Sequence, residues 1–536
     1  MIFNTLDVII VVVYLVFVFG IVIYYSRKTT NITQYFLADR SIPWFVIGAA
    51  LFATDLSGEH FLGLANEGFS SGLAVSNFVL SACVVLMLLG WLFTPFYLKT
   101  GVFTMPQFLE KRYNEQCRWY LSTISITAFI LTKVSATLLA GGIVLKHVMG
   151  WDIYTSALVL VLTAGLYTLL GGSRGIIMVQ VVQAFFIILG SAILVYYGLE
   201  EVGGWEALKT KVPVDYFKIF KPMDHPDFPW TGMVFGALIL GIWYWTTDQY
   251  IVQITLSARN IDHARSGTLF AGYLRLLPIL LLVVPGIIAK ALYPEIPASS
   301  AYITLVTNLL PSGIRAIVII SLLAALMTSL SSSFNATSTL FTMDIYNKLY
   351  PKANDFVLVN IGRIATFVVV VFGIIWVPFI YALSNDIYFY IQSVQSYIAP
   401  PICVVFLVGI FWARANGTAA FSVLIIGFIL GMIKFVSDIL YRSFNVRGGI
   451  VSFLGEINFL HFAIFLFLFS VLLIIVISLQ TNPPEEKKVK GFTLKYANEI
   501  VKDEDYKRES GKYKKLNMVA TVVLVLILFL YWFVFG

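Results

Sequence analysis

Acidic and imidazole groups interrupt one apolar stretch of this chain at a place where they could bind an ion or a small solute. The stretch GAALFATDLSGEHFLGLANEGFSSG (48–72) contains Asp55, Glu59 and His60 beside several glycines. If it spans a membrane, each polar group is costly unless it faces a cavity or a partner. The pattern predicts a helix broken in mid-membrane, whose freed carbonyls can bind a cation or a solute. The alternative is a continuous helix whose acids bond to neighbouring helices.

A second interruption gathers aromatic rings around an acid. The run WYWTTDQY (243–250) contains Tyr244, Trp245 and Asp248 within an apolar segment. Aromatic faces are a common stacking surface for sugar rings, and they are equally frequent in cores and at membrane interfaces. The residues alone leave both interpretations open.

A third segment, 322–346, is rich in hydroxyl groups. On a helix, Ala325, Thr328, Ser329 and Ser332 lie on one face because they are spaced by three and four residues. Hydroxyl and carbonyl oxygens together suit an alkali cation and are poor ligands for zinc or copper. The alternative is that small hydroxyl side chains simply allow close helix packing.

Three further polar side chains lie inside apolar segments: Lys133, Arg275 and Gln392. The two basic groups could each form a buried ion pair with an acid of the interrupted segments. Gln392 is uncharged, so we expect it to form hydrogen bonds with a polar solute.

The composition requires these groups to work inside a membrane. Of 536 residues, 59% are hydrophobic and 12% charged, whereas soluble proteins have about 25% charged residues. The net charge of +7 does not indicate nucleic-acid binding, because most Lys and Arg residues flank apolar segments, as topology signals do. Three cysteines without metal or disulfide spacing, and no protease, hydrolase or phosphate-loop motif, argue against a metalloprotein or an enzyme.

Apolar segments long enough to cross a bilayer recur about fourteen times, without the alternation of barrel strands. We therefore predict an all-α polytopic membrane protein with five-plus-five inverted repeats, broken at spans 2 and 7. The expected organisation is a first span and connection (1–43), first repeat (44–199), outer loop (200–231), second repeat (232–412), two further spans (413–480), a charged, solvated cytoplasmic linker (481–516) and a last span (517–536). Placing both termini outside puts most Lys and Arg residues in cytoplasmic connections.

These segments together resemble the sodium:solute symporter family, in its sodium/glucose cotransporter branch, from about residue 7 to residue 412. The matching runs, in order, are QYFLADRSIPWF (34–45), GEHFLGLANEGFSSGLA (58–74), GVFTMPQFLEKRY (101–113), IWYWTTDQYIVQ (242–253), LSARN (256–260), FNATSTLFTMDIY (334–346) and YIQSVQSYIAPP (390–401). The resemblance implies an inverted-repeat fold and sodium-driven import by alternating access across the plasma membrane.

The resemblance also implies roles for individual residues. Sodium, the coupling ion, would bind to carbonyls and hydroxyls of Ala53, Leu56, Ala325, Thr328 and Ser329. The solute would contact His60, Gln392, Tyr244, Trp245, Arg275 and Asp55. Leu64 and Tyr388 would form an outer gate, and Tyr244 also an inner gate.

Four positions depart from the family pattern. Val79 stands where the family has a sugar-binding glutamate, Arg275 replaces a lysine, and Asp55 replaces an asparagine. Val179 and Gln180 replace a threonine–aspartate pair on the inner cation path. The leading hypothesis is sodium-coupled import of a sugar, polyol or sugar derivative. An amino acid, carboxylate or other anionic solute is the alternative, and a non-transporting sensor with the same fold is the third.

Overall fold

The computed structural model describes residues 4–26, 31–383, 387–442, 444–499 and 511–536, the side chains of 377, 379–383, 387–390, 497–499 and 511–512 excepted. In this part of the chain the secondary structure is helical and no β-strand is present. The first α-helices are α1 (Thr5–Ser26), α2 (Ile32–Leu37), α3 (Trp44–Asp55), α4 (Gly58–Ser71), α5 (Ser76–Leu88), α6 (Thr94–Lys99), α7 (Met105–Arg112), α8 (Glu115–Ala128), α9 (Ser135–Met149), α10 (Ile153–Val202) and α11 (Trp205–Lys211). They continue with α12 (Ala237–Ile242), α13 (Gln249–Leu256), α14 (Ile261–Leu274), α15 (Val284–Leu292), α16 (Ala301–Leu309), α17 (Ile314–Leu340), α18 (Asn347–Leu349), α19 (Asp355–Leu383), α20 (Ile387–Phe411), α21 (Gly417–Arg442), α22 (Gly449–Glu456), α23 (Phe459–Gln480), α24 (Glu486–Val489) and α25 (Gly511–Phe535).

Several helices contain or continue into π-helical segments, which hold one residue more per turn than an α-helix. These are η3 (Leu89–Phe93), η4 (Phe129–Val134), η6 (Gly232–Gly236), η7 (Trp243–Thr247), η8 (Ile279–Val283) and η10 (Phe341–Tyr346). The 3₁₀ segments are η1 (Ala38–Arg40), η2 (Gly72–Val75), η5 (Val214–Phe217), η9 (Ala298–Ser300) and η11 (Leu494–Glu499). None of the π segments was predicted from the sequence.

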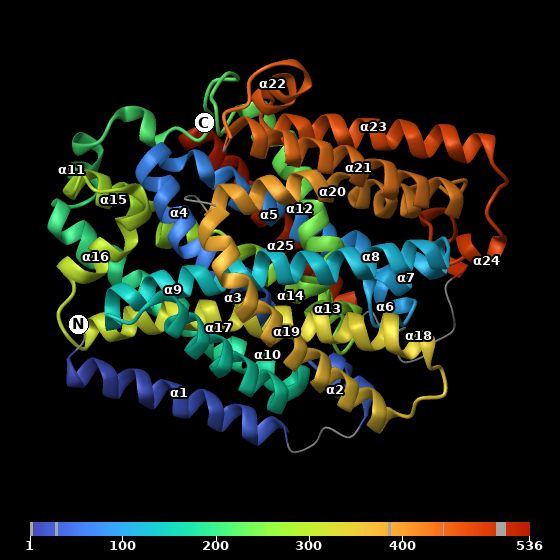
Figure 1. The fold of residues 1–536 in the computed structure, drawn as a ribbon, viewed down its shortest axis with the longest axis horizontal. Helices are drawn as coiled ribbons and strands as arrows, with labels where there is room; N and C mark the ends of the chain where they lie inside the picture. The colour runs from blue at the N-terminus through green and yellow to red at the C-terminus, as the bar shows by residue number, and fades with distance from the viewer. Residues whose placement is uncertain (1–3, 27–30, 384–386, 443, 500–510) are drawn as a thin grey trace.

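The long helices run in roughly the same direction and form a bundle with two ends (Figure 1). We call the end with α7, α18 and α24 the α24 end, and the end with α11, α15 and α16 the α11 end. Among the described residues, 11 helical stretches are long and apolar enough to cross a membrane, and Trp44–Asp55 and Gly232–Thr247 are shorter apolar helices. The prediction of an all-helical, multi-pass membrane protein is therefore confirmed.

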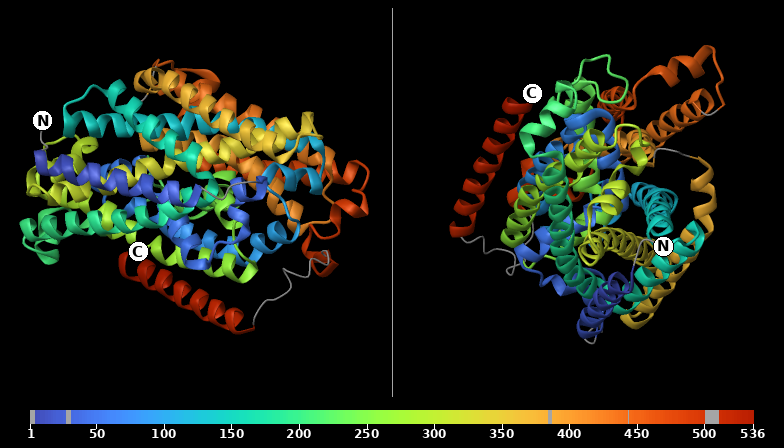
Figure 2. Two further views of the ribbon diagram at one scale, coloured as in Figure 1. Left: turned by 90° about the horizontal axis from the view of Figure 1, so that it is seen from below. Right: turned by 90° about the vertical axis from the view of Figure 1, so that its left-hand side faces the viewer.

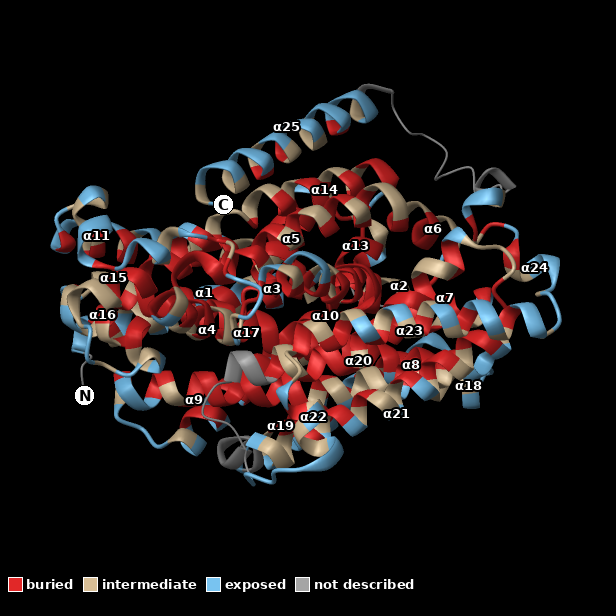
Figure 3. Cartoon of the chain, turned by 90° about the horizontal axis from the view of Figure 1, so that it is seen from above, coloured by how far each residue is buried: buried red, intermediate tan, exposed pale blue. Residues whose placement is uncertain are grey.

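Buried residues fill the centre of the bundle, while α25 lies along its outside (Figures 2 and 3). The last helix, α25, packs on α14, and two hydrogen bonds join the two helices. Tyr273 OH donates to the Ala520 carbonyl at 2.5 Å, and Ser266 Oγ donates to Asn517 Oδ1 at 2.9 Å. At the far end of α25, the Phe535 carbonyl accepts from the amide of Ile219, between η5 and η6, at 2.8 Å.

Two helices are broken, as the sequence predicts. Between α3 and α4 the chain is extended at Ser57 (φ −83°, ψ 175°). Between η7 and α13 it is extended at Asp248 (φ −78°, ψ 124°), whose side chain caps α13 by accepting from the Tyr250 amide at 3.1 Å. These breaks place polar backbone and side chains in the middle of the bundle.

The segment after α23 is not a solvated linker throughout. Lys488 Nζ donates to the Glu110 carbonyl of α7 at 2.8 Å. Val489 and Thr493 are buried, and the Phe492 ring lies 5.7 Å from that of Phe108. Residues 488–493 of the predicted linker are therefore docked on the α24 end, where Phe492 packs against Phe108.

Candidate functional site

The break between α3 and α4 frees two backbone carbonyls. In a continuous helix, the amides of Ser57 and His60 would donate to the carbonyls of Ala53 and Leu56. Instead Ser57 N–H donates to the Asp55 carbonyl at 2.9 Å, and His60 N–H donates to the Ser57 carbonyl at 3.0 Å. The carbonyls of Ala53 and Leu56, both predicted cation ligands, therefore lack the amide donors that a continuous helix would supply.

The hydroxyl-rich helix α17 packs against both α3 and α4. Its predicted cation ligands Ala325, Thr328 and Ser329 are all buried. Thr328 Oγ1 lies 2.7 Å from the Ala324 carbonyl one turn earlier and also contacts the side-chain amide oxygen of Gln183, and its single proton serves one of these two acceptors. The helix thus presents buried oxygen atoms to the broken segment, and their role as cation ligands stays a prediction.

The second break is held by a buried ion pair. Lys133 Nζ lies 2.6 Å from Asp248 Oδ2, and the two side chains are 5% and 1% exposed. The same ammonium group lies 4.5 Å from the ring centre of Tyr244 and 3.8 Å from that of Tyr250. Of the acids that the sequence offers to Lys133, the partner is therefore Asp248, the cap of α13.

A polar cavity is bordered by residues of both broken helices. Its lining includes the six predicted solute contacts, Asp55, His60, Tyr244, Trp245, Arg275 and Gln392. They come from α4 and the end of α3, from η7, from the kink after α14, and from α20. The structure brings these residues together, and solute binding by them stays a prediction.

The two charges of Arg275 and Asp55 compensate each other. Arg275 follows α14 directly, where Pro278 prevents a continuous helix, and its guanidinium forms an ion pair with the Asp55 carboxylate. The two side chains are 5% and 2% exposed. His60 Nε2 lies 4.0 Å from Asp55, and its Nδ1 lies 3.0 Å from Ser57 Oγ. Arg275 thus lines the cavity as half of an ion pair.

Of the two predicted outer-gate residues, the structure describes the side chain of Leu64. Leu64 is fully buried on α4. The side chain of Tyr388 lies outside the described part of the chain. Val79, which stands where the resemblance implies a sugar contact, is fully buried, whereas its neighbours Phe78 and Ser81 line the cavity.

Sequence reasoning assigned no solute role to Glu59, Ser81 or Gln395, which also line the cavity. The signal for Gln395 was its spacing of three residues from Gln392, which places both on one face of α20. Glu59 was noted only as an acid in the interrupted segment. Ser81 gave no signal, because an isolated serine in an apolar helix is common.

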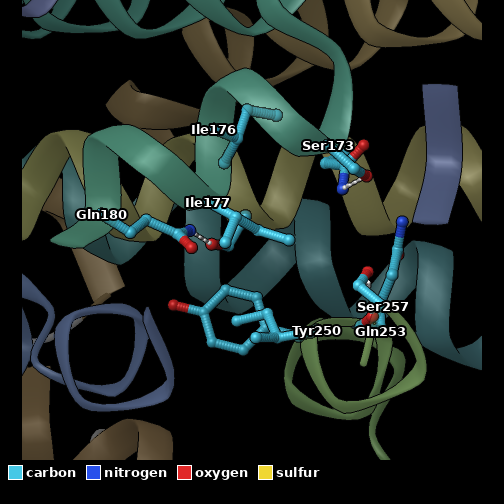
Figure 4. A pocket seen from close by; sticks show the side chains of 10 residues that line it. Ser173, Ile176, Ile177, Gln180, Tyr250, Gln253 and Ser257 are labelled. Atoms are coloured by element: carbon cyan, nitrogen blue, oxygen red, sulfur yellow. Dashed lines mark hydrogen bonds between the residues drawn. The ribbon is translucent and has the colours of Figure 1, made fainter. Parts of the chain in front are cut away.

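A second, smaller cavity is lined by Gln180 and Tyr250 among others (Figure 4). Ser332 and Asn335, which follow Ser329 along α17, also line it. Gln180 Nε2 donates to Ser332 Oγ at 2.7 Å, and Ser332 Oγ lies 3.2 Å from Thr54 Oγ1. Gln180 therefore joins a chain of neutral polar groups that leads from the first break into this inner cavity.

Comparisons with known proteins agree with this geometry. Residues 35–427 match the sodium:solute symporter family. The sodium/glucose cotransporter 1 of Ovis aries is 38% identical over 90% of this chain and 79% of its own length. The sodium/myo-inositol cotransporter of Homo sapiens is 33% identical over 95% of this chain and 78% of its own length.

Solved structures share the fold. A substrate-bound, outward-open sodium-coupled sialic acid symporter aligns with a TM-score of 0.78 at 20% identity, covering 90% of this chain and 99% of that one. A nucleobase-cation-symport-1 family transporter in a closed conformation aligns with a TM-score of 0.52 at 12% identity, covering 87% and 98%. At these identities the likeness concerns the fold alone.

Proposed function

The chain belongs to the sodium:solute symporter family, and from this premise we propose that it imports a sugar, a polyol or a sugar derivative together with sodium. Similar relatives are named as cotransporters of sodium with glucose or with myo-inositol. The protein is a transporter rather than an enzyme. Transport by such a fold proceeds by exposing one central site to each side of the membrane in turn.

The proposal rests on one observation: the break between α3 and α4 frees two carbonyls, and α17, which bears buried hydroxyl groups, packs against both helices. We assign sodium to the carbonyls of Ala53, Leu56 and Ala325 and to the hydroxyls of Thr328 and Ser329. All five ligands are neutral oxygens, a set that suits an alkali cation. A bound cation would connect α17 to the α3–α4 break.

The solute that best suits the cavity is neutral and rich in hydroxyl groups. The Arg275 charge is matched by Asp55, and the Lys133 charge by Asp248. An anionic solute would have to compete with Asp55 for the guanidinium, and removing one partner from a buried pair is costly. His60 and Gln392 offer hydrogen bonds, and Tyr244 and Trp245 offer faces for a sugar ring.

Sodium binding is coupled to solute binding because residues of the two proposed sites are neighbours in the chain. The sodium carbonyls of Ala53 and Leu56 flank Asp55, whose side chain lines the solute cavity. When sodium fixes the backbone of the break, it also fixes the carboxylate and its partner Arg275. The membrane potential adds about 2.3 kcal/mol per charge for each 100 mV.

We assign the α11 end and both termini to the outside and the α24 end to the cytoplasm. With this orientation, Leu64 and Tyr388 belong to the outer gate. Tyr244 separates the solute from the inner side. The inner cavity beside Gln180 then lies on the cytoplasmic side of the sodium ligands.

Uptake by proteoliposomes tests the proposal. The purified protein is reconstituted, and an inward sodium gradient is imposed with potassium as the control cation. Labelled glucose, galactose, myo-inositol, an N-acetylated sugar, sialic acid and proline are then offered. We expect sodium-dependent accumulation of a neutral sugar or polyol.

Accumulation of sialic acid or proline alone would overturn the neutral-solute assignment and leave sodium coupling intact. Binding of a sugar without any sodium-dependent accumulation would overturn transport itself.

A further inference from the structure

Tyr250 contacts both broken helices and the hydroxyl-bearing helix α17. It lies in the first turn of α13, directly after the second break, and is 3% exposed. Its hydroxyl lies 2.6 Å from the Thr54 carbonyl in the first broken helix and 3.1 Å from Ser329 Oγ on α17. Its ring lies 6.3 Å from that of Tyr244 and beneath the Lys133 ammonium group.

The phenol of Tyr250 has a single proton, and the carbonyl oxygen of Thr54 can only accept one. The phenol therefore donates to Thr54, which is also the nearer partner. Ser329 then donates its own hydroxyl proton to the phenol oxygen. Thr137 Oγ1, 3.3 Å away, then donates to Ser329 Oγ, which leaves one lone pair of Ser329, rather than its proton, available to a cation.

Without the phenol, the Ser329 hydroxyl would turn toward a different acceptor. A serine in a helix can donate to the carbonyl three or four residues earlier, which for Ser329 is Leu326 or Ala325. Both patterns occur on α17: Ser321 and Ser331 donate to the carbonyls three residues earlier, at 2.6 and 3.0 Å, and Thr337 and Thr339 donate to those four residues earlier, each at 2.7 Å. The described bonds of Ser329 go instead to Tyr250 and, at 3.3 Å, to Thr137.

We propose that Tyr250 is a positioning residue of the cation site, which keeps the Ser329 hydroxyl and the Ala325 carbonyl free for sodium. This inference rests on the proposed sodium-coupled function and on Ser329 as a sodium ligand. Losing the phenol oxygen turns the Ser329 proton onto a carbonyl of its own helix, that of Leu326 or of the cation ligand Ala325, and so weakens Ser329 as a ligand.

The same contact links sodium binding to the solute side. Tyr250 moves with α13 and with the Asp248–Lys133 pair, and Tyr244 precedes the same break. A shift of the second broken helix therefore withdraws the phenol from Ser329 and lowers the affinity for sodium. Tyr250 also lines the inner cavity, and its hydroxyl is directed to the side on which Gln180 lies (Figure 4).

Tyr250→Phe tests the proposal because it keeps the ring and removes only the hydroxyl. The sodium concentration for half-maximal uptake is measured in proteoliposomes, and the solute KM is measured at saturating sodium. The matched control is Tyr97→Phe, which removes a buried phenol bond of 2.7 Å to the Thr246 carbonyl on the same broken helix but touches no cation ligand. Each variant is taken from its folded fraction in gel filtration.

We expect Tyr250→Phe to raise the half-saturating sodium concentration about tenfold, with the solute KM at saturating sodium within about twofold of wild type and Tyr97→Phe unchanged. In a Ser329→Ala background, Tyr250→Phe should add almost nothing, because the two residues act through one hydroxyl. A normal sodium response in Tyr250→Phe, an equal shift in Tyr97→Phe, or independent effects in the double variant would each overturn the proposal. An unchanged sodium response in Ser329→Ala would overturn both the ligand assignment and this inference. A wild type without sodium-dependent uptake would overturn the proposed function itself.

Discussion

Arg275 and Asp55 are two buried side chains of opposite charge inside a membrane protein. Each is buried, and each supplies the other's counter-charge. The sequence predicted an acidic partner for Arg275 but could not choose among the acids or between a partner and an anionic solute. That choice depends on the direction of a long side chain after the kink at Pro278, which no local pattern encodes.

Arg275→Met is expected to lose sodium-dependent uptake almost completely, because it leaves the Asp55 carboxylate buried without a counter-charge, at a cost of about 3–5 kcal/mol. The double variant Asp55→Asn/Arg275→Met removes both charges. It should recover thermal stability in detergent and part of the uptake. Arg275→Lys, which keeps the charge, is the control.

If Arg275 instead binds an anionic group of the solute, the double variant would transport no better than Arg275→Met. Uptake and thermal unfolding measured on the same preparations separate the two outcomes.

At the scale of elements, a polar cluster joins helices at the α24 end. Arg118 of α8 donates from Nε to Asp344 Oδ1 at 2.9 Å and from Nη2 to the Met343 carbonyl at 2.7 Å. Thr104, the cap of α7, donates to the same Asp344 oxygen at 2.9 Å. The cluster therefore ties the end of the hydroxyl-bearing helix to α7 and α8.

Glu110 of α7 extends this cluster to Lys348, whose Nζ lies 2.5 Å from Glu110 Oε1. Burial by itself would raise the pKa of Glu110, but hydrogen bonds from Lys348 and Arg118 hold that pKa below its ordinary value. The bonds of the ionised carboxylate stabilise the fold above the unfolded-state pKa and are lost as pH falls through the lowered one. They are thus retained at neutral pH.

Asp344→Asn is expected to loosen the closure of the α24 end, because it removes the charge that Arg118 holds. A cysteine placed at Asn335, beside the inner cavity, should then react several-fold faster with a thiol reagent added from the cytoplasmic side. Glu206→Gln, at an exposed ion pair in the outer loop, is the control. An unaltered reaction rate in Asp344→Asn would show that the cluster does not restrain the inner end.

The two helix breaks were predictable from the sequence. A polar side chain in a membrane-spanning segment costs so much free energy that its presence indicates a cavity, a partner or a break. The π-helical segments were not predictable, since a π turn leaves the hydrophobic pattern almost unchanged. The docking of 486–499 on α7 was missed for a different reason. Val489 and Phe492 are two apolar side chains among many charges, and the partial burial of Phe492 depends on the ring of Phe108, which is distant in sequence.

For the whole molecule, the composition predicted an all-helical membrane protein, and the polar residues inside apolar segments predicted the two helix breaks. The residue roles came from resemblance, since neither composition nor spacing distinguishes a sodium hydroxyl on α17 from a packing hydroxyl. The cavity itself could not be predicted. It depends on the crossing of α4, α5, η7 and α20, whose contacts lie far apart in sequence.

The proposed orientation predicts which end of the bundle an external reagent reaches. Glu206→Cys in the outer loop should react with a membrane-impermeant maleimide added to intact cells, and Lys487→Cys in α24 should react only after the cells are opened. Both positions are well exposed, at 84% and 75%. The native Cys83, Cys117 and Cys403 are buried, so the background is low. Labelling in the reverse order would invert the assigned topology.

A π-helical segment allows the register of a helix to change locally while the rest of the helix stays in place. Each segment holds a surplus residue, and a surplus residue that passes along a helix by one position rotates the side chains it has passed by about 100°. The ends of the helix need not move, and the hydrogen bonds are exchanged one at a time. Because η7 carries Tyr244 and Trp245, and η10 carries Met343 and Asp344, such a shift in one of these segments would turn the aromatic wall of the cavity or the anchor of the α24 end.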